Sequence, residues 1–236
     1  MDPLRILDRS DMGQPRRPSE FYKWVMAKFS QLAATDEAKA FARSGAVLPK
    51  KFYDEVFPLA IFAEREFAAR DDVLVQPNLD NDNFDGRITV GTGSNAKTMF
   101  VEITYAKVGY DESLRMEFLC REGHVSLTGP VSSSGRKGWP NRKIHVEDEA
   151  VSHLAMLENY LVIVRERLKE KTRSCHGRNH VLVVAVDDHL PLRQPSDVDQ
   201  LRSAASSWLS ELTLDFGRLV FLGMAGNLYL SYDLED

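Results

Sequence analysis

The chain has 236 residues, of which 43% are hydrophobic and 28% are charged, a composition that is ordinary for a globular protein. No apolar run approaches the roughly 18 residues that cross a bilayer, which excludes a membrane-spanning helix. The amino-terminal segment has no apolar core of the signal-peptide kind, and Cys120 and Cys175 are too few for a disulfide framework. These features predict a cytoplasmic protein with one domain and an appendage, or with two small domains.

The net charge of −5 argues against a general nucleic-acid binder, but the charges are unevenly distributed. Residues 113–178 contain twelve Lys or Arg against eight Asp or Glu, so the rest of the chain is markedly acidic. This basic excess is typical of a solvated, salt-bridged helix surface. A local patch that faces phosphate groups is the other interpretation.

The amino-terminal part of the chain is predicted to be helical. Ser19 could cap a helix that runs to about residue 43. A second helix is expected over residues 50–70, with a kink at Pro58. We therefore divide the chain into an amino-terminal helical extension, residues 1–49, and an α/β domain, residues 50–236.

The α/β domain alternates predicted strands and helices. The strand-like runs are residues 72–77, 84–90, 98–106, 180–188, 218–223 and 227–232, and the helical runs are residues 111–123, 147–173 and 197–213. Turn-forming residues separate the first three strands, which indicates an antiparallel meander, and the link "GMAGN" predicts a hairpin of the last two. A Gly/Ser/Pro-rich loop is expected over residues 128–141. This order predicts a mixed α/β or α+β sheet with helices packed against it.

Two of the predicted strands each carry one acidic residue among apolar and β-branched neighbours, Asp85 in "NFDGRITV" and Glu102 in "FVEITYAKV". Because side chains alternate along a strand, the two acids could lie close together on one face of a hairpin. Close carboxylates repel each other unless a positive charge lies between them, and Mg²⁺ typically uses one or two protein carboxylates with water and phosphate oxygens. Asp85 and Glu102 are therefore candidate ligands of Mg²⁺ or Mn²⁺ in a site for phosphodiester hydrolysis. Ordinary strand charges that face water are the alternative.

These residues and the order of elements resemble the PD-(D/E)XK, or restriction-endonuclease-like, nuclease superfamily. Its motif is an acid on the second strand of a meander, then Asp or Glu, any residue and Lys on the third strand. Asp85 and Glu102 match the acids, whereas Thr104 stands where the motif has Lys. The resemblance implies an αβββαβ core over residues 50–188, with amino-terminal helices before it and a helix and a β-hairpin after it.

Members of this superfamily sometimes take the lysine from the following helix, and sometimes add a glutamate from the first helix. The apolar stripe of the helix 147–173 continues at helical spacing to Lys171; its members are Val151, Leu154, Leu157, Leu161, Val164 and Leu168. Lys171 is therefore the candidate for a relocated catalytic cation, and a lysine whose ammonium stays in water is the alternative. On the first helix, the stripe Phe52, Val56, Leu59 and Ala63 continues to Glu66, with Glu64 in reserve. Local surface salt bridges are the alternative for both glutamates.

Four basic residues are weaker candidates for contacts to nucleic acid: Arg115, Arg136, Lys137 and Arg167. We interpret the chain as a metal-dependent nuclease-like protein, an endonuclease or phosphodiesterase that hydrolyses phosphodiester bonds. A catalytically degenerate member of the same fold, binding nucleic acid or protein without cutting, is the alternative that Thr104 and the acidic overall charge favour. A third interpretation is an unrelated α/β interaction protein. The amino-terminal helices could form a homodimer surface or an element that sets substrate specificity.

Overall fold

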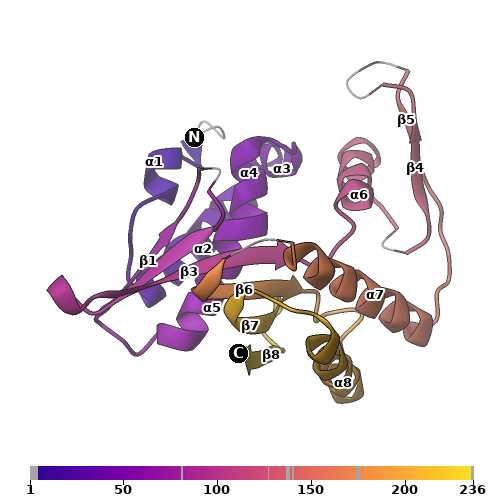
Figure 1. Cartoon of the computed structure of the whole chain (residues 1–236). Helices are drawn as coiled ribbons and strands as arrows, with labels where there is room; N and C mark the ends of the chain where they lie inside the picture. The colour runs from indigo at the N-terminus through magenta and orange to yellow at the C-terminus, as the bar shows by residue number, and fades with distance from the viewer. Residues whose placement is uncertain are drawn as a thin grey trace.

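A computed structural model describes residues 5–80, 82–126, 128–136, 139, 141–173 and 176–234. Its strands are β1 (Val73–Pro77), β2 (Gly86–Val90), β3 (Lys97–Tyr105), β4 (Val131–Ser134), β5 (Lys143–Val146), β6 (Gly177–Val186), β7 (Phe216–Gly223) and β8 (Tyr229–Asp233). Its helices are α1 (Arg9–Met12), α2 (Pro18–Leu32), α3 (Asp36–Arg43), α4 (Val47–Lys51), α5 (Phe57–Phe67), α6 (Gly109–Glu122), α7 (His153–Lys171) and α8 (Pro195–Glu211). Helices cover both faces of a mixed sheet (Figure 1), so the predicted mixed α/β class is confirmed.

The large sheet has six strands in the order β1-β2-β3-β6-β7-β8. β1, β2 and β3 form the predicted antiparallel meander, and β3, β6 and β7 are parallel neighbours. β8 returns antiparallel to β7, which confirms the predicted hairpin. The parallel pairing of β3 with β6 requires a crossover connection, and α6, the β4–β5 hairpin and α7 supply it.

The central strands contribute to two hydrophobic cores, one on each face of the sheet. Val101 and Ile103 of β3 belong to the core under α2 and α5, whereas Leu182 and Val184 of β6 belong to the core under α7 and α8. All residues of β6 from position 180 onward are buried, as predicted for a strand covered on both faces. Figure 1 shows this layering, with the amino-terminal helices in indigo to purple on one face and α7 and α8 on the other.

The amino-terminal helices pack directly on the sheet. Phe21 of α2 is fully buried in the same cluster as Val75 of β1. The helix expected from Ser19 to about residue 43 is two helices, because Thr35 caps a new one. Its side chain accepts a hydrogen bond from the N–H of Ala38 at 3.2 Å, which satisfies a free donor at the start of α3.

The helix expected over residues 50–70 contains a π-helical turn, Phe52–Val56, between α4 and α5. Here the N–H of Phe57 donates to the carbonyl of Phe52, five residues back. Pro58 follows immediately, and it has no N–H to donate to a regular α-helical turn. A π-helical turn thus lies where the kink was predicted, a feature that is frequent at functional sites.

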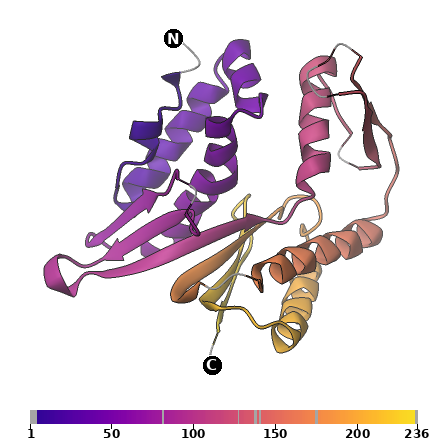
Figure 2. The same cartoon turned by 45° about the horizontal axis from the view of Figure 1, so that its top comes forward.

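An arm formed by α6 and the β4–β5 hairpin leaves the sheet between β3 and α7. The loop expected over residues 128–141 contains part of this hairpin, in which Ser132 pairs with His145 and Ser134 with Lys143. A serine-rich strand has no apolar alternation that predicts it, and its formation depends on contacts with α6. Figures 1 and 2 both show the arm projecting away from the sheet.

The long helix α7 begins later than the sequence predicted. Ser152 caps it by accepting a hydrogen bond from the N–H of Ala155 at 3.2 Å. The expected start near Glu147 was wrong, because the N–H of Glu147 donates instead to the carbonyl of Pro130 at 3.1 Å, at the base of the hairpin. Within the described ranges, neither α7 nor any other helix is long and apolar enough to cross a membrane.

Candidate functional site

Asp85 and Glu102 face each other across the start of β2 and the middle of β3. The strand register ends with Gly86 paired with Val101, and Asp85, which directly precedes Gly86, lies close enough to Glu102 for the two charges to interact. The N–H of Asp85 donates to the carbonyl of Val101 at 2.8 Å, and the N–H of Ile103 donates to Asp85 Oδ2 at 2.7 Å. Because Val101 and Ile103 point into the core under α2 and α5, the side chain of Glu102 points to the opposite face.

The Asp85 carboxyl is held in a setting that disfavours its ionised form. Burial raises the pKa of Asp85, and the negative charge of Glu102 raises it further, to about 6. The hydrogen bond from Ile103 and the charges of Lys171 and Lys51 act in the opposite direction without cancelling these effects. Additional positive charge beside Asp85 would therefore stabilise its carboxylate form.

Lys171 reaches Glu102 from the last turn of α7. Its ammonium donates to Glu102 Oε1, and the two side chains are only 21% and 13% exposed, so this ion pair is largely shielded from water. Lys171 continues the buried stripe of α7, whose members are Leu157, Tyr160, Val164 and Leu168. Leu154 was expected in this stripe but is 57% exposed, because the start of α7 extends beyond the ends of β3 and β6 (Figure 1).

A third carboxylate, that of Glu55, approaches Asp85 from the π-helical turn. Burial raises the pKa of Glu55, its hydrogen bond with Lys51 lowers it, and the negative charge of Asp85 raises it. Lys51 Nζ lies 2.9 Å from Glu55 Oε2. The sequence contained a signal for Glu55, which lies three residues after Phe52 and four before Leu59 on the buried side of the helix. That spacing does not indicate which residue of the helix lies beside Asp85.

Glu66 lies against β7 and β8, away from this group. Its carboxylate accepts hydrogen bonds from Arg218, at 2.7 Å from Nη1, and from the Tyr229 hydroxyl. Burial alone would raise the pKa of Glu66, but these two hydrogen bonds hold it below its usual range. Glu66 follows Glu55 by eleven residues, or about 16 Å along a helix, and the structure does not bring it to Asp85.

Two other residues considered from the sequence also have defined surroundings. Glu64 accepts a hydrogen bond from the Ser19 hydroxyl at 2.8 Å, so it links α5 to α2. Thr104 lies two residues after Glu102 on the same face of β3 and is half-buried. The side chain at the position of the motif lysine is therefore close to the site but carries no charge.

Arg115 and Arg167 make contacts within the chain. Arg115 donates to the carbonyls of Ser126 and Gly129 at 2.8 and 2.6 Å, which holds the link between α6 and β4. Arg167 donates to the carbonyl of Lys107 at 2.7 Å, which ties α7 to the end of β3. Both guanidinium groups thus position backbone segments near the site.

Arg136 lies at the tip of the β4–β5 hairpin, with its guanidinium 5.6 Å from the ring centroid of Trp139. Trp139 is 55% exposed. Lys143 and His145 are exposed on the outward side of the same hairpin. Lys137 lies outside the described residues.

A row of three rings in contact borders the two carboxylates. Phe84 lies 4.7 Å from Phe100, and Phe100 lies 4.9 Å from His180, between ring centroids. Phe84 directly precedes Asp85, and Phe100 shares the face of β3 with Glu102. Sequence reasoning treated these phenylalanines as ordinary strand residues, although their positions beside the two acids were a usable signal.

The site contains two facing carboxylates and no larger set of metal ligands. Across the described ranges, no group of three or more His, Cys, Asp or Glu side chains could hold a single metal ion. No family model, curated protein or solved structure matches the chain. A function for the chain therefore has to be inferred from the geometry and charge of the site.

Proposed function

We propose that the chain is a metal-dependent phosphodiester hydrolase of the nuclease-like class. The observation that carries this proposal is the proximity of Asp85, Glu102 and Lys171, which come from three separate segments: Lys171 is bonded to Glu102, and the charges of both act on the Asp85 carboxyl. A structural ion pair would need only one carboxylate beside Lys171. The second carboxylate, that of Asp85, is buried beside the negative charge of Glu102 and has a raised pKa, which favours a role in binding a cation.

Asp85 and Glu102 suit Mg²⁺ or Mn²⁺ better than a metal that needs a closed set of protein ligands. Asp85 Oδ2 accepts a hydrogen bond from Ile103, which leaves Oδ1 for a ligand. Glu102 Oε1 is bonded to Lys171, which leaves Oε2. Mg²⁺ keeps several waters and binds through one or two carboxylates plus substrate phosphate oxygens. When bound there, such a cation activates water and stabilises the oxygen that leaves phosphorus.

Lys171 would supply the fixed positive charge that Thr104 cannot. The Glu102 carboxylate holds the ammonium in place, and the Lys171 side chain, although largely shielded, keeps 21% of its surface exposed. An ammonium in this position can orient an attacking water by hydrogen bonding and balance negative charge that develops on the phosphate. We assign Lys171 the role that the motif lysine has in the PD-(D/E)XK superfamily.

The outward side of the β4–β5 hairpin supports nucleic acid as the substrate. Ser132, Ser134, Lys143 and His145 are its exposed residues, and Arg136 and Trp139 follow at the tip. This surface combines cations with hydroxyl groups and an exposed aromatic ring, and one carboxylate, that of Glu147, lies at its base with Oε1 3.8 Å from His145 Nε2. Such a surface fits phosphate groups and an unstacked base.

The test compares the full chain with Glu102→Gln on labelled single-stranded and duplex DNA and RNA, with Mg²⁺, with Mn²⁺ and with a chelator. We expect cleavage by the parent only when metal is present, and none by Glu102→Gln. Calorimetric titration with Mn²⁺ should show one site in the parent and a much weaker one in the variant. Glu166→Gln is the matched control, because Glu166 is an exposed carboxylate on the same helix as Lys171 and pairs only with Lys169 in the described part of the chain.

A binding module without catalysis is the second candidate, and the uncharged side chain of Thr104 favours it. In that case the parent chain binds the same nucleic acids in the presence of chelator and cuts none of them with either metal. Binding that persists in Glu102→Gln, without cleavage by the parent, would select this candidate. Absence of both metal binding and nucleic-acid binding would overturn both.

A further inference from the structure

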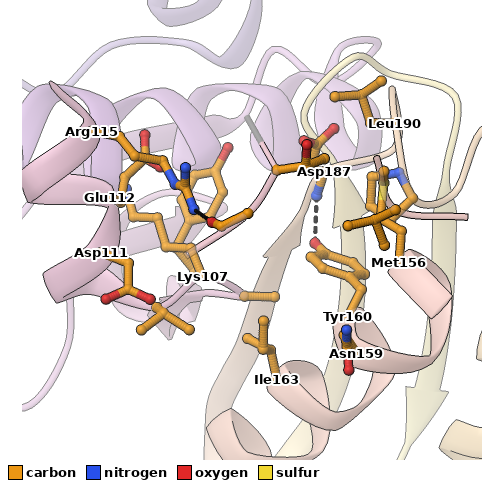
Figure 3. Close-up of a pocket in the computed structure, with 17 residues that line it drawn as sticks. Lys107, Asp111, Glu112, Arg115, Met156, Asn159, Tyr160, Ile163, Asp187 and Leu190 are labelled. Atoms are coloured by element: carbon orange, nitrogen blue, oxygen red, sulfur yellow. Dashed lines mark hydrogen bonds between the residues drawn. The ribbon is translucent and has the colours of Figure 1, made fainter. Parts of the chain in front are cut away.

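A cavity of about 500 Å³ lies where β3 and β6 end, between the base of the arm and the first half of α7 (Figure 3). In α/β sheets the crevice outside the carboxyl ends of parallel strands is a preferred place for ligands, because the connecting segments leave in different directions there. The volume is that of a site for a small molecule.

The walls of the cavity are mainly aromatic and apolar. Members include Tyr105, Met156, Tyr160, Ile163, Leu190 and Pro191. Tyr160 is only 8% exposed, and its hydroxyl accepts a hydrogen bond from the N–H of Asp187 at 2.6 Å. This bond, drawn as a dashed line in Figure 3, fixes one wall against the end of β6.

The two cations in the wall are already engaged by groups of the chain. Lys107 Nζ lies 2.6 Å from Asp54 Oδ1 and 4.5 Å from the ring centroid of Tyr105. Arg115 donates through both terminal nitrogens to backbone carbonyls in the link between α6 and β4. The charge of Lys107 is thus offset by Asp54, which lies outside the cavity wall, and Arg115 is the one described cation left to set against the carboxylates of the wall.

Three carboxylates in the wall have no ion-pair partner within the described part of the chain. Asp111 and Glu112 lie on the first turn of α6, and Asp187 directly follows β6. The described contact of the Asp187 carboxylate is a hydrogen bond from the N–H of His189 at 2.9 Å. The cavity thus carries more negative charge than its own residues balance.

The pKa of Tyr105, at the end of β3, reflects the same excess of negative charge. Burial raises the pKa of Tyr105, and the charges of Asp187, Asp54 and Glu112 each raise it further. A bound cation would lower the electrostatic free energy of the whole group.

We propose that this cavity binds a small organic cation, a protonated amine or a guanidinium attached to an apolar body. The cationic group would lie beside Asp187, on the side that faces Asp111 and Glu112, and the apolar body would pack against Met156 and Ile163. An anion would meet three carboxylates there. A neutral molecule would leave their charges unbalanced.

This site is separate from the carboxylate pair of the proposed hydrolase. Tyr160 and Lys171 lie on the same helix, eleven residues or about 16 Å apart. Glu102 and Lys171 do not line the cavity. The inference therefore does not depend on the proposed hydrolase activity.

The test uses 2-phenylethylamine, protonated at pH 7, and 2-phenylethanol, which has nearly the same shape without the charge. Calorimetry or protein-observed NMR on the full chain at constant ionic strength should give about tenfold tighter binding, or more, for the amine. Glu112→Gln and Asp187→Asn should each weaken amine binding several-fold and leave the alcohol unchanged. Glu158→Gln, an exposed carboxylate of α7 outside the cavity, is the control and should change neither.

Ile163→Trp, which adds volume to the wall without changing charge, should abolish binding of both compounds, with circular dichroism to verify folding. The proposal is overturned if the alcohol binds as tightly as the amine, if 3-phenylpropionate binds more tightly than both, or if the carboxamide variants bind the amine as the parent does. Amine binding should persist in Glu102→Gln, so failure here and failure of the hydrolase proposal are distinguishable.

Discussion

Acidic side chains lie near both the middle and the end of β3, but their negative charge is balanced by a nearby cation to different extents in the two places. At Glu102 a lysine from α7 forms a shielded ion pair, and a second carboxylate, Asp85, lies opposite. At the end of the strand, Lys107 is paired with Asp54, and the carboxylates that line the cavity have no ion-pair partner among the described residues.

This contrast separates two kinds of site on one strand. A polar pair of carboxylates beside a fixed ammonium suits a divalent cation and a phosphate. A largely apolar cavity with unbalanced carboxylates suits an organic cation. Each site can therefore be disabled on its own, and the experiments below use that independence.

The largest effect is expected for Glu102→Gln, which should reduce metal-dependent cleavage by about 10³-fold, because several kcal/mol of charge stabilisation are lost with the ligand. Cleavage rates at saturating Mn²⁺ measure this effect. Amine binding in the cavity should be unchanged in the same variant. A loss of both functions together would contradict the separation of the two sites.

Lys171→Met should slow cleavage by about 100-fold, because the group that orients the attacking water is removed. Metal binding should persist or strengthen, since Glu102 no longer shares an oxygen with an ammonium. Single-turnover rates and Mn²⁺ titration on one preparation check both points. A variant that cuts at the parental rate would show that Lys171 has only a structural role.

Glu66→Gln should destabilise the fold by about 1–3 kcal/mol, because Arg218 loses a half-buried, charge-assisted hydrogen-bond partner. Cleavage per folded molecule should be unchanged, since Glu66 lies against β7 and β8. Urea denaturation gives the first quantity and initial rates give the second. A selective loss of cleavage at full stability would mean that Glu66 acts in the site after all.

Asp85→Asn should change the pH dependence of stability. The pKa of Asp85 is raised to about 6 in the folded chain, above its ordinary value near 3.8. The folded state therefore holds the proton more tightly, and this group makes the chain less stable as the pH rises from about 4 to about 6. Urea denaturation across this pH range should show that the free energy of unfolding falls less in the variant than in the parent. Added Mg²⁺ should reduce the fall in the parent and have no such effect in the variant.

The smallest effects are expected on the arm. Arg136→Ala and Lys143→Ala should each weaken nucleic-acid binding a few-fold and reduce the slope of log affinity against log salt by about one. Fluorescence anisotropy of a labelled nucleic acid at several salt concentrations measures this slope. The arm variants are made in the Glu102→Gln background, so that the labelled nucleic acid is not cleaved. Lys39→Ala, an exposed lysine on α3 that pairs with Asp36, is the control.

Much of the large sheet could be predicted from the sequence, because its signals are local. Alternation identified β1, β2 and β3, and a continuous apolar run identified β6 as a strand covered on both faces. The same periodicity put Asp85 and Glu102 on faces that could meet and placed Lys171 on the buried side of its helix. These predictions needed only the repeat of a strand or a helix.

Other features depended on which segments meet in space. The buried stripe that ends at Glu66 is present, but Glu55, in the π-helical turn before α5, is the residue that lies near Asp85. Which residue does so depends on how this helical segment lies across the sheet. The β4–β5 hairpin contains serines that no strand pattern marks, and it forms against α6.

The sequence by itself determined the sheet-forming segments and the chemistry available on them, because side-chain direction repeats every two or 3.6 residues. Only the tertiary structure decided that Lys171 meets Glu102, that Lys107 is paired with Asp54, and that a cavity remains between the arm and α7. These outcomes join residues tens of positions apart. They are set by packing and by competition among charges for partners, neither of which a local repeat contains.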